Sequence, residues 1–253
     1  MPRLHSSLGS QEDNRLTKTV VITQSNYIPW RGYFDMFRLA DEVVLLDSVQ
    51  YTRRDWRNRN KIKTPQGPSW LSISVEVKGK YSQSIDETRV ADLTWAESHW
   101  RTISLAYRRA AHFETHGQWV EDLLRSAGKE LLLTDVNEQL IRAICEKLKI
   151  GTSIRRCTDL LPVAAMAEMD SSERLAALAE RVGATRYISG PAAKAYLDHA
   201  AFGKRGIEVA WMDYSNYPPH PQLWGAFEPA VSVIDLILNT GDEANRYLDK
   251  TSV

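Results

Sequence analysis

The chain has 253 residues, of which 43% are hydrophobic and 25% charged, a composition typical of a globular protein with one sizeable core. Lysine plus arginine and aspartate plus glutamate both number 32, so the formal net charge is zero. Bulk electrostatics therefore give no reason to expect a nucleic-acid or membrane partner. The two cysteines, Cys145 and Cys157, are too few for a disulfide framework and lack metal-ligand spacing, which predicts buried free thiols in a reducing compartment.

The start of the chain is polar and lacks the apolar core of a secretory signal, so residues 1–18 are predicted to be a flexible leader. No apolar run in the sequence reaches the roughly 18 residues of a membrane span. We therefore expect a cytoplasmic protein without a membrane partner. Residues 19–253 are expected to form a single α/β domain.

The first predicted element is a strand over residues 19–23, because β-branched residues with an apolar centre suit a strand buried on both faces of a parallel sheet. A polar turn over residues 24–26 follows. A helix is predicted from near Pro29 to Leu39, since proline suits the first turn of a helix and aromatic residues recur at helical spacing. A short apolar strand over residues 43–46 completes a unit the size of a βαβ motif.

The middle of the chain has mostly helical patterns. Residues 70–77 alternate apolar and polar side chains, which predicts a strand with one solvated face. A capping-box pattern at residues 94–97 predicts the start of a helix, and further amphipathic helices are predicted near residues 113–126 and 132–148. We therefore expect a helical subdomain at about residues 94–150.

The last third of the chain returns to alternating strands and helices. The predicted elements are a strand at residues 153–157, a helix capped at Asp170 and ending at Gly183, a strand at 186–189, a short helix at 195–197, a strand at 206–211 and a helix at 231–238. The repeated order predicts an α/β fold, a Rossmann-like mostly parallel sheet with a helical middle region.

Polar segments follow three of the predicted strands, at residues 24–27, 47–51 and 189–190. Ligands of open α/β sheets bind outside the carboxyl ends of the strands, so these segments are expected to meet at one cleft. The helix near Pro29 points its positive end toward the same cleft, which suits an anion. The candidate substrate-binding residues from these segments are Gln24, Asn26, Tyr27, Gln50 and Ser189. Asp47 is a candidate catalytic base, and its alternative role is to cap a turn.

A basic segment follows the second of these turns and has six basic side chains in the eleven residues from Arg53 to Lys63. Arginine forks bind phosphate or carboxylate groups, and tryptophan stacks on flat rings. The alternative interpretation is a solvated face paired with nearby acids. If the segment binds a ligand, the candidates are Arg53, Trp56, Arg57 and Asn58 for binding and Asn60 and Lys61 for catalysis.

Several familiar sites lack their sequence signals. The chain has no GxSxG elbow, no Walker loop and no GxGxxG motif, so serine hydrolase, ATPase and dinucleotide enzyme are all unsupported. His112 and His116 have i,i+4 spacing but no HExxH frame, so no metal site is predicted. No cofactor is evident. Aromatic residues between Trp211 and Phe227 either line a pocket or pack as core and lid.

Three groups of motifs resemble the WbqC-like family of bacterial proteins. The first is QSNYIPWRGYF at residues 24–34, similar to the family's Q-P-x-Y-x-P-x-x-G-Y-F, with Ser25 in place of the usual proline. The second comprises DSVQY at residues 47–51 and WRNRNKI at residues 56–62. The third comprises RYISG at residues 186–190, GIEV at residues 206–209 and SVIDL at residues 232–236, and the similarity spans roughly Val20 to Gly241. The serine changes the rigidity of the turn but leaves the predicted site in place.

The resemblance implies a function in surface-polysaccharide biosynthesis, where an acyl or aminoacyl transferase role on an amino sugar has been proposed for the family. On this interpretation an amide forms between an activated acyl group, for example glycyl, and an amine on a nucleotide-linked sugar. The expected partners are an anionic or phosphorylated small molecule and an activated acyl donor, with no nucleic acid unless that donor is a charged tRNA. Two alternatives remain open: a nucleotidyltransferase-like enzyme, although the HxGH histidines of that class are missing, and a non-catalytic binder of a phosphorylated ligand.

Overall fold

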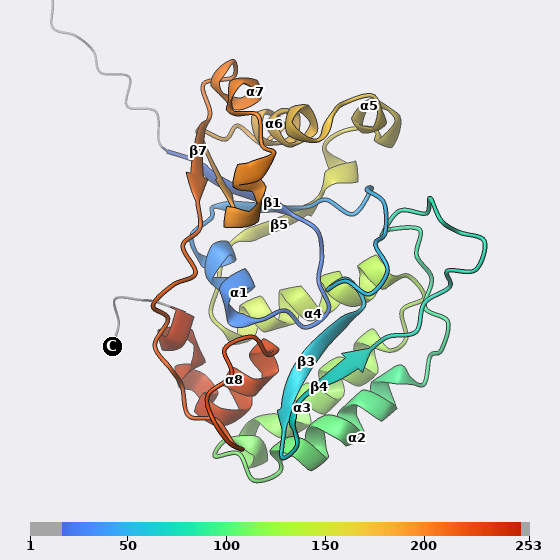
Figure 1. The fold of residues 1–253 in the computed structure, drawn as a ribbon, viewed down its shortest axis with the longest axis vertical. Helices are drawn as coiled ribbons and strands as arrows, with labels where there is room; N and C mark the ends of the chain where they lie inside the picture. Colours follow the sequence, from blue (N-terminus) through green and yellow to red (C-terminus); the bar gives the residue numbers. More distant parts are fainter. Residues whose placement is uncertain (1–16, 249–253) are drawn as a thin grey trace, which may run out of the picture.

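A five-stranded parallel sheet forms the centre of the protein, of which the computed structural model describes residues 17–248 (Figure 1). The predicted leader therefore lies outside the described residues, except for Thr17 and Lys18. The strand order is β5–β2–β1–β6–β7, and every pairing is parallel. The strands are β1 (Thr19–Thr23), β2 (Glu42–Leu45), β5 (Ser153–Arg156), β6 (Arg186–Ser189) and β7 (Glu208–Trp211). The predicted Rossmann-like α/β fold is confirmed.

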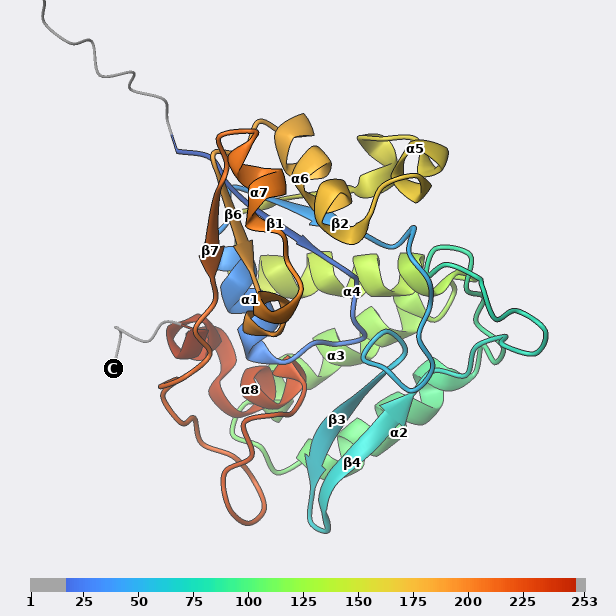
Figure 2. The same cartoon turned by 45° about the horizontal axis from the view of Figure 1, so that its top comes forward.

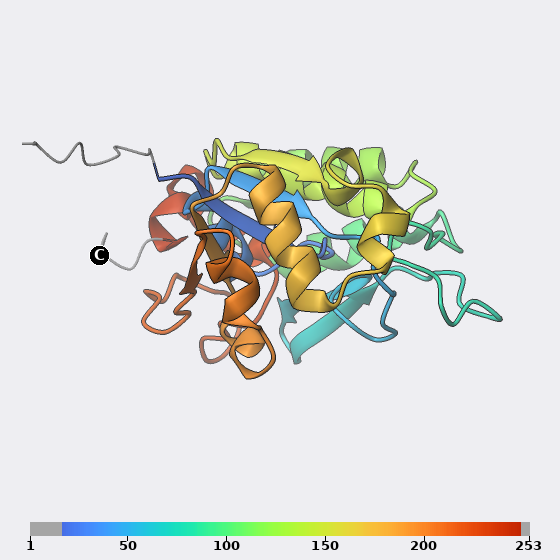
Figure 3. The same ribbon diagram turned by 90° about the horizontal axis from the view of Figure 1, so that it is seen from above.

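Helices cover both faces of the sheet. Successive residues of each strand point to opposite faces, so they belong to different hydrophobic clusters. Val21 belongs to one hydrophobic cluster, and Val20 and Ile22 belong to another. Helices α1 (Arg31–Arg38) and α4 (Leu133–Lys147) cover the first face, while α6 (Ser171–Arg181) and α7 (His199–Gly203) cover the second. Figure 2 shows these two layers, and Figure 3 shows α6 lying across β1 and β2.

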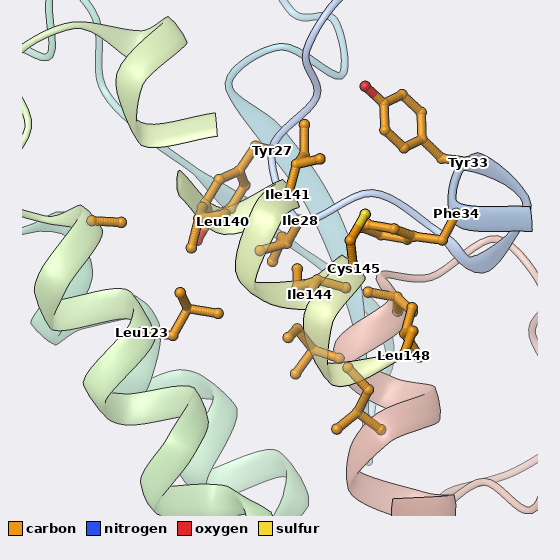
Figure 4. Packing of buried hydrophobic residues seen from close by; sticks show 14 of the residues in the cluster. Tyr27, Ile28, Tyr33, Phe34, Leu123, Leu140, Ile141, Ile144, Cys145 and Leu148 are labelled. Atoms are coloured by element: carbon orange, nitrogen blue, oxygen red, sulfur yellow. The ribbon is translucent and has the colours of Figure 1, made fainter. Parts of the chain in front are cut away.

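The chain between β2 and β5 forms a hairpin and three helices. The hairpin strands are β3 (Arg59–Thr64) and β4 (Gly67–Ser72), and the helices are α2 (Trp95–Tyr107), α3 (Phe113–Ala127) and α4. Figure 4 shows Tyr27 and Ile28, from the segment after β1, pointing into the same cluster as Leu140 and Ile144 of α4. These helices therefore share one hydrophobic core with the sheet.

The remaining elements are short. They are η1 (Cys157–Asp159), α5 (Val163–Ala167), η2 (Pro191–Ala195), α8 (Val233–Thr240) and η3 (Gly241–Leu248). A buried polar network ties α8 to the hairpin: the Tyr107 hydroxyl donates to Asp235 Oδ2 at 2.8 Å and accepts from the Lys63 amide at 2.9 Å. His220 Nε2 lies 2.8 Å from Asp235 Oδ1. This network fixes the position of the hairpin against the rest of the fold.

Three local predictions need correction. The strand expected at residues 70–77 is β4, which ends at Ser72, and its partner β3 lies within the basic segment, where no strand was predicted. The capping box at Thr94 does not form, because the Thr94 hydroxyl donates to Asp92 Oδ1 at 2.7 Å. The short helix expected at residues 195–197 is a 3₁₀ turn that already ends at Ala195.

Other predictions are confirmed. The Asp170 side chain caps α6 by accepting from the backbone amides of Ser172 and Glu173, both at 2.9 Å. Cys145 and Cys157 are both buried and form no disulfide. Within residues 17–248 no helix is long and apolar enough to cross a membrane.

Candidate functional site

A cavity of about 630 Å³ lies at the carboxyl ends of the central strands. The chain leaves β1 toward β2 on one side, whereas β6 and β7 lie on the other side, so the strand order reverses between β1 and β6. Ligands of open α/β sheets bind at this reversal point. The cavity has the size of an ordinary small-molecule site. Its wall includes Thr23 and Gln24 after β1, Ser189 and Gly190 after β6, and residues of α1, α6 and the basic loop.

Hydrogen bonds hold the turn after β1 against the basic loop. The Tyr27 amide donates to the Trp56 carbonyl at 2.9 Å. The Asn137 side chain, on α4, donates to Ser25 Oγ at 3.1 Å and to the Arg57 carbonyl at 2.8 Å. The two segments that were expected to face a shared hollow therefore do so, and α4 fixes their spacing from behind.

Arg57 brings positive charge into the cavity. Its guanidinium group donates to Asn26 Oδ1 and lies 3.5 Å from a carboxylate oxygen of Asp55. Only 14% of the Arg57 side chain is exposed. The contact with Asp55, whose side chain is 30% exposed, is longer than a charge-assisted hydrogen bond, so it does not prevent the guanidinium group from binding an anion.

Arg174 is a second cationic residue of the wall, and the sequence reasoning missed it. Its Nε donates to the Met166 carbonyl at 2.8 Å and its guanidinium also donates to the Met169 carbonyl at 2.9 Å. No aspartate or glutamate of the described residues lines this cavity. The wall therefore has a net positive charge, which favours an anionic ligand.

Aromatic side chains lie between the cavity and a smaller hollow. Trp30 and Tyr214 meet edge to face, with ring centroids 5.1 Å apart, and burial raises the pKa of the Tyr214 hydroxyl to about 12. The Trp30 ring lies so close to Gly32 that a Cβ there would come within 2.4 Å of it. The smaller hollow, of about 220 Å³, is lined by Asn26, Pro29, Trp30, Trp56, Asn60 and Ala230. Since Asn26, Trp30 and Trp56 line both spaces, the two are neighbours.

The structure brings together six of the candidate residues chosen from the sequence. Gln24, Asn26, Trp56, Arg57 and Ser189 line the larger cavity, and Asn60 lines the smaller hollow. The Asn60 side chain holds the turn in place, because its Nδ2 donates to the carbonyls of Tyr27 and Ile28 and its Oδ1 accepts from the Lys61 amide. Asn60 is thus a positioning residue whose polar atoms are already used.

Two candidates are buried away from the cavity. Tyr27 has no exposed surface, and its hydroxyl lies 2.7 Å from His99 Nδ1. Asp47 is 4% exposed and accepts from the Ser25 amide at 2.8 Å and from the Thr134 hydroxyl at 2.6 Å. Burial raises the pKa of Asp47, although these hydrogen bonds oppose the shift. Neither residue reaches a ligand, so a role for Tyr27 in binding and for Asp47 as the base is not supported.

The remaining candidates lie elsewhere on the surface. Gln50 and Arg53 line a separate hollow of about 300 Å³, where their side chains donate to the carbonyls of Tyr81 and Val77, both at 2.8 Å. Asn58 donates to the Ile73 carbonyl at 2.8 Å. Lys61 projects over the Trp70 ring, 5.1 Å from its centroid. Within the described chain, no group of three histidine, cysteine, aspartate or glutamate residues is placed to hold a metal ion.

Comparison with known proteins places these residues in a family context. The sequence model of the WbqC-like protein family matches residues 24–247, which include every residue of the cavity wall after Thr23. The chain is also 45% identical to the uncharacterized protein Rv1507c of Mycobacterium tuberculosis over 231 residues, covering 91% of this chain and 97% of that protein. No solved structure shows significant similarity.

Proposed function

The chain belongs to the WbqC-like protein family, and we propose that it is a transferase that binds a nucleotide-linked, amine-bearing sugar in the cavity at the strand ends. One observation carries the proposal: two arginines, Arg57 and Arg174, share a wall that contains no acidic side chain of the described residues. Two guanidinium forks suit the two phosphate groups of a diphosphate. The aromatic rings of Trp30, Trp56 and Tyr214 offer flat surfaces to a base or a sugar ring.

The second half of the proposal is the transfer of an acyl or aminoacyl group, such as glycyl, to the sugar amine. The nitrogen attacks the acyl carbon, an amide bond forms, the bond to the leaving group breaks, and the amine proton leaves with that group. Because the described cavity wall has no carboxylate, histidine or lysine, catalysis rests on positioning, which alone supplies several powers of ten in rate. The product serves surface-polysaccharide synthesis, and a cytoplasmic location belongs to the same proposal.

A non-catalytic binder of a phosphorylated ligand is the second candidate, and the same lack of a base in the described wall favours it. Nucleotidyl transfer is less well supported, because carboxylate ligands for a divalent ion are missing from the wall as described. Release of pyrophosphate from a nucleoside triphosphate would distinguish nucleotidyl transfer from both other candidates.

Calorimetry with a panel of nucleotide-linked amino sugars tests the proposed site. We expect at least one to bind, with affinity reduced at least about tenfold by Arg57→Ala and by Arg174→Ala, since each removes a charged hydrogen bond worth about 1.5–3 kcal/mol. Arg101→Ala is the matched control, because Arg101 is exposed on α2 and does not line the cavity. Mass spectrometry of the bound sugar with activated acyl donors then separates transfer from binding alone. Unchanged affinity in both arginine variants would refute the site.

A further inference from the structure

We propose that the outer face of the β3–β4 hairpin binds the single-stranded end of an RNA and directs that end toward the cavity. This face, called the hairpin face below, consists of Arg54, Trp56, Arg59, Lys61 and Trp70. RNA binding by the hairpin face does not depend on the proposed function. The further conclusion, that the acyl donor is an aminoacyl-tRNA, rests on the proposed function.

The register of the hairpin separates an inner from an outer side. Asn60 and Ile62 of β3 are 3% and 0% exposed and point toward the core. Since alternate residues of a strand point to opposite sides, Arg59 and Lys61 point outward. Lys61 pairs with Trp70 across the hairpin, and 42% of Trp70 is exposed. The outer side therefore has half-buried cations around a partly exposed indole ring, and Figure 2 shows the β3–β4 hairpin that forms it.

The cations of the hairpin face have no acidic partner. The Arg59 guanidinium lies 4.2 Å and the Lys61 ammonium 5.1 Å from the centroid of the Trp70 ring. The Arg59 guanidinium also donates to the Arg54 carbonyl. Among the described residues neither Arg54, Arg59 nor Lys61 forms an ion pair with a carboxylate. Some surface cations elsewhere are paired, as Arg125 is with Glu97 and Glu121. The hairpin face thus has uncompensated positive charge that complements a polyanion.

An aromatic path leads from the hairpin face to the site. The Trp56 ring lies 5.5 Å from the Trp70 ring, and Trp56 is itself 41% exposed. Trp56 also lines both the cavity and the smaller hollow. Proteins that bind single-stranded nucleic acids combine this arrangement of stacking rings and backbone-tracking cations. An anionic membrane would also be attracted to the cations but does not require two neighbouring tryptophan rings. The rings therefore favour single-stranded RNA as the ligand.

If the RNA end that reaches the cavity carries an amino acid, it can serve as the acyl donor. In an aminoacyl-tRNA the amino acid is an ester of the terminal ribose. The sugar amine attacks the ester carbon, the amide C–N bond forms, the ester C–O bond breaks, and the ribose hydroxyl leaves with the amine proton. No oxidant, reductant or other co-reactant is required.

Fluorescence anisotropy with a labelled eight-nucleotide single-stranded RNA and with unfractionated tRNA tests the surface, at several salt concentrations. The variants are Trp70→Ala and Arg59→Ala/Lys61→Ala. The matched control is Arg108→Ala/Arg109→Ala, which also removes two cations, here both exposed and one of them beside a tryptophan, Trp224. Circular dichroism establishes that each variant is folded.

We expect both RNAs to bind, with affinity reduced at least about tenfold by Trp70→Ala. The double hairpin variant should lower the magnitude of the slope of log K against log salt by about 1.4, because each neutralised phosphate of a single strand contributes about 0.7. No RNA binding, equal loss in the control, or equal affinity for a fully paired duplex would overturn the proposal, as would a preference for anionic lipid vesicles. Nucleotide-sugar binding measured on the same variants should be unchanged, which separates failure of this surface from failure of the cavity.

Discussion

The guanidinium group of Arg57 donates a hydrogen bond to Oδ1 of Asn26, which joins the basic loop to the turn after β1. An arginine has only donors, so the amide of Asn26 must turn its oxygen toward Arg57 and its NH₂ group away. Within the described residues that NH₂ group forms no hydrogen bond with the protein. Asn26 is thus oriented by Arg57 and keeps two donors free at the boundary between the cavity and the smaller hollow.

Asn26→Asp should weaken the binding of a nucleotide-linked sugar more than Asn26→Ala does. The alanine variant loses the amide donors and the orientation of Arg57, for which we expect a loss of about tenfold. The aspartate variant has the same shape but pairs with Arg57 and places a negative charge in the cavity, for which we expect a loss of about a hundredfold. Calorimetry measures both. An aspartate variant that binds as tightly as the native protein would show that the ligand is not an anion at this position.

Gly32→Ala should displace the Trp30 ring and weaken ligand binding several-fold. The new methyl group would lie 2.4 Å from the ring, closer than atoms in contact can come, so the indole must move from the wall of both hollows. Gly203→Ala is the matched control, since Gly203 is also helical and a Cβ there meets no atom within 4 Å. Comparing the affinity of the two variants for the same nucleotide-linked sugar measures the effect. Equal affinities would mean that the Trp30 face is not part of the binding surface.

Asp47→Asn should leave ligand affinity unchanged while altering the pH dependence of stability. Burial raises the pKa of Asp47 above its ordinary value of 3.8, so the folded state holds the proton more tightly than the unfolded state. This contribution to stability is complete below pH 3.8 and is lost as the pH rises through the raised pKa. The free energy of unfolding of the native protein relative to Asp47→Asn should therefore fall as the pH rises from about 4. Urea unfolding across this range checks the sign, and a difference that grows with pH would contradict it.

His99 should make the protein sensitive to acid. Burial lowers its pKa from 6.5 to about 4, so the neutral ring that contacts the Tyr27 hydroxyl contributes stability above pH 6.5. That stability is lost as the pH falls toward 4. The difference between the two pKa values corresponds to about 3 kcal/mol of unfolding free energy. In His99→Gln the free energy of unfolding should depend less on pH between 6.5 and 4. If the native protein and the variant have parallel pH profiles, His99 is not the responsible group.

The sequence predicted the parallel sheet because β-branched runs such as β1 fit buried strands and because strands and helices alternate along the chain. It did not predict β3, because Arg59, Asn60 and Lys61 place polar residues on both faces of the strand. Asn60 is buried because its amide group donates hydrogen bonds to the carbonyls of Tyr27 and Ile28. Hydrophobic alternation is the signal for a half-buried strand, and a buried asparagine removes it.

The sequence predicted those cavity residues whose positions follow from the backbone topology. Gln24, Asn26 and Ser189 follow strands and line the cavity, as expected for strand ends. Asp47 also follows a strand, but Thr134 of the distant α4 covers it, which no local pattern indicates. Arg174 could have been found, because the first turn of the helix before β6 must lie at the same edge of the sheet as the strand ends.

A crystal structure of the protein with a nucleotide-linked amino sugar tests the central claim most directly. We expect the diphosphate between the guanidinium groups of Arg57 and Arg174, with the sugar or the base against Trp30 and Trp56. A diphosphate bound instead in the hollow of Gln50 and Arg53, or on any surface away from the carboxyl ends of β1 and β6, would contradict it.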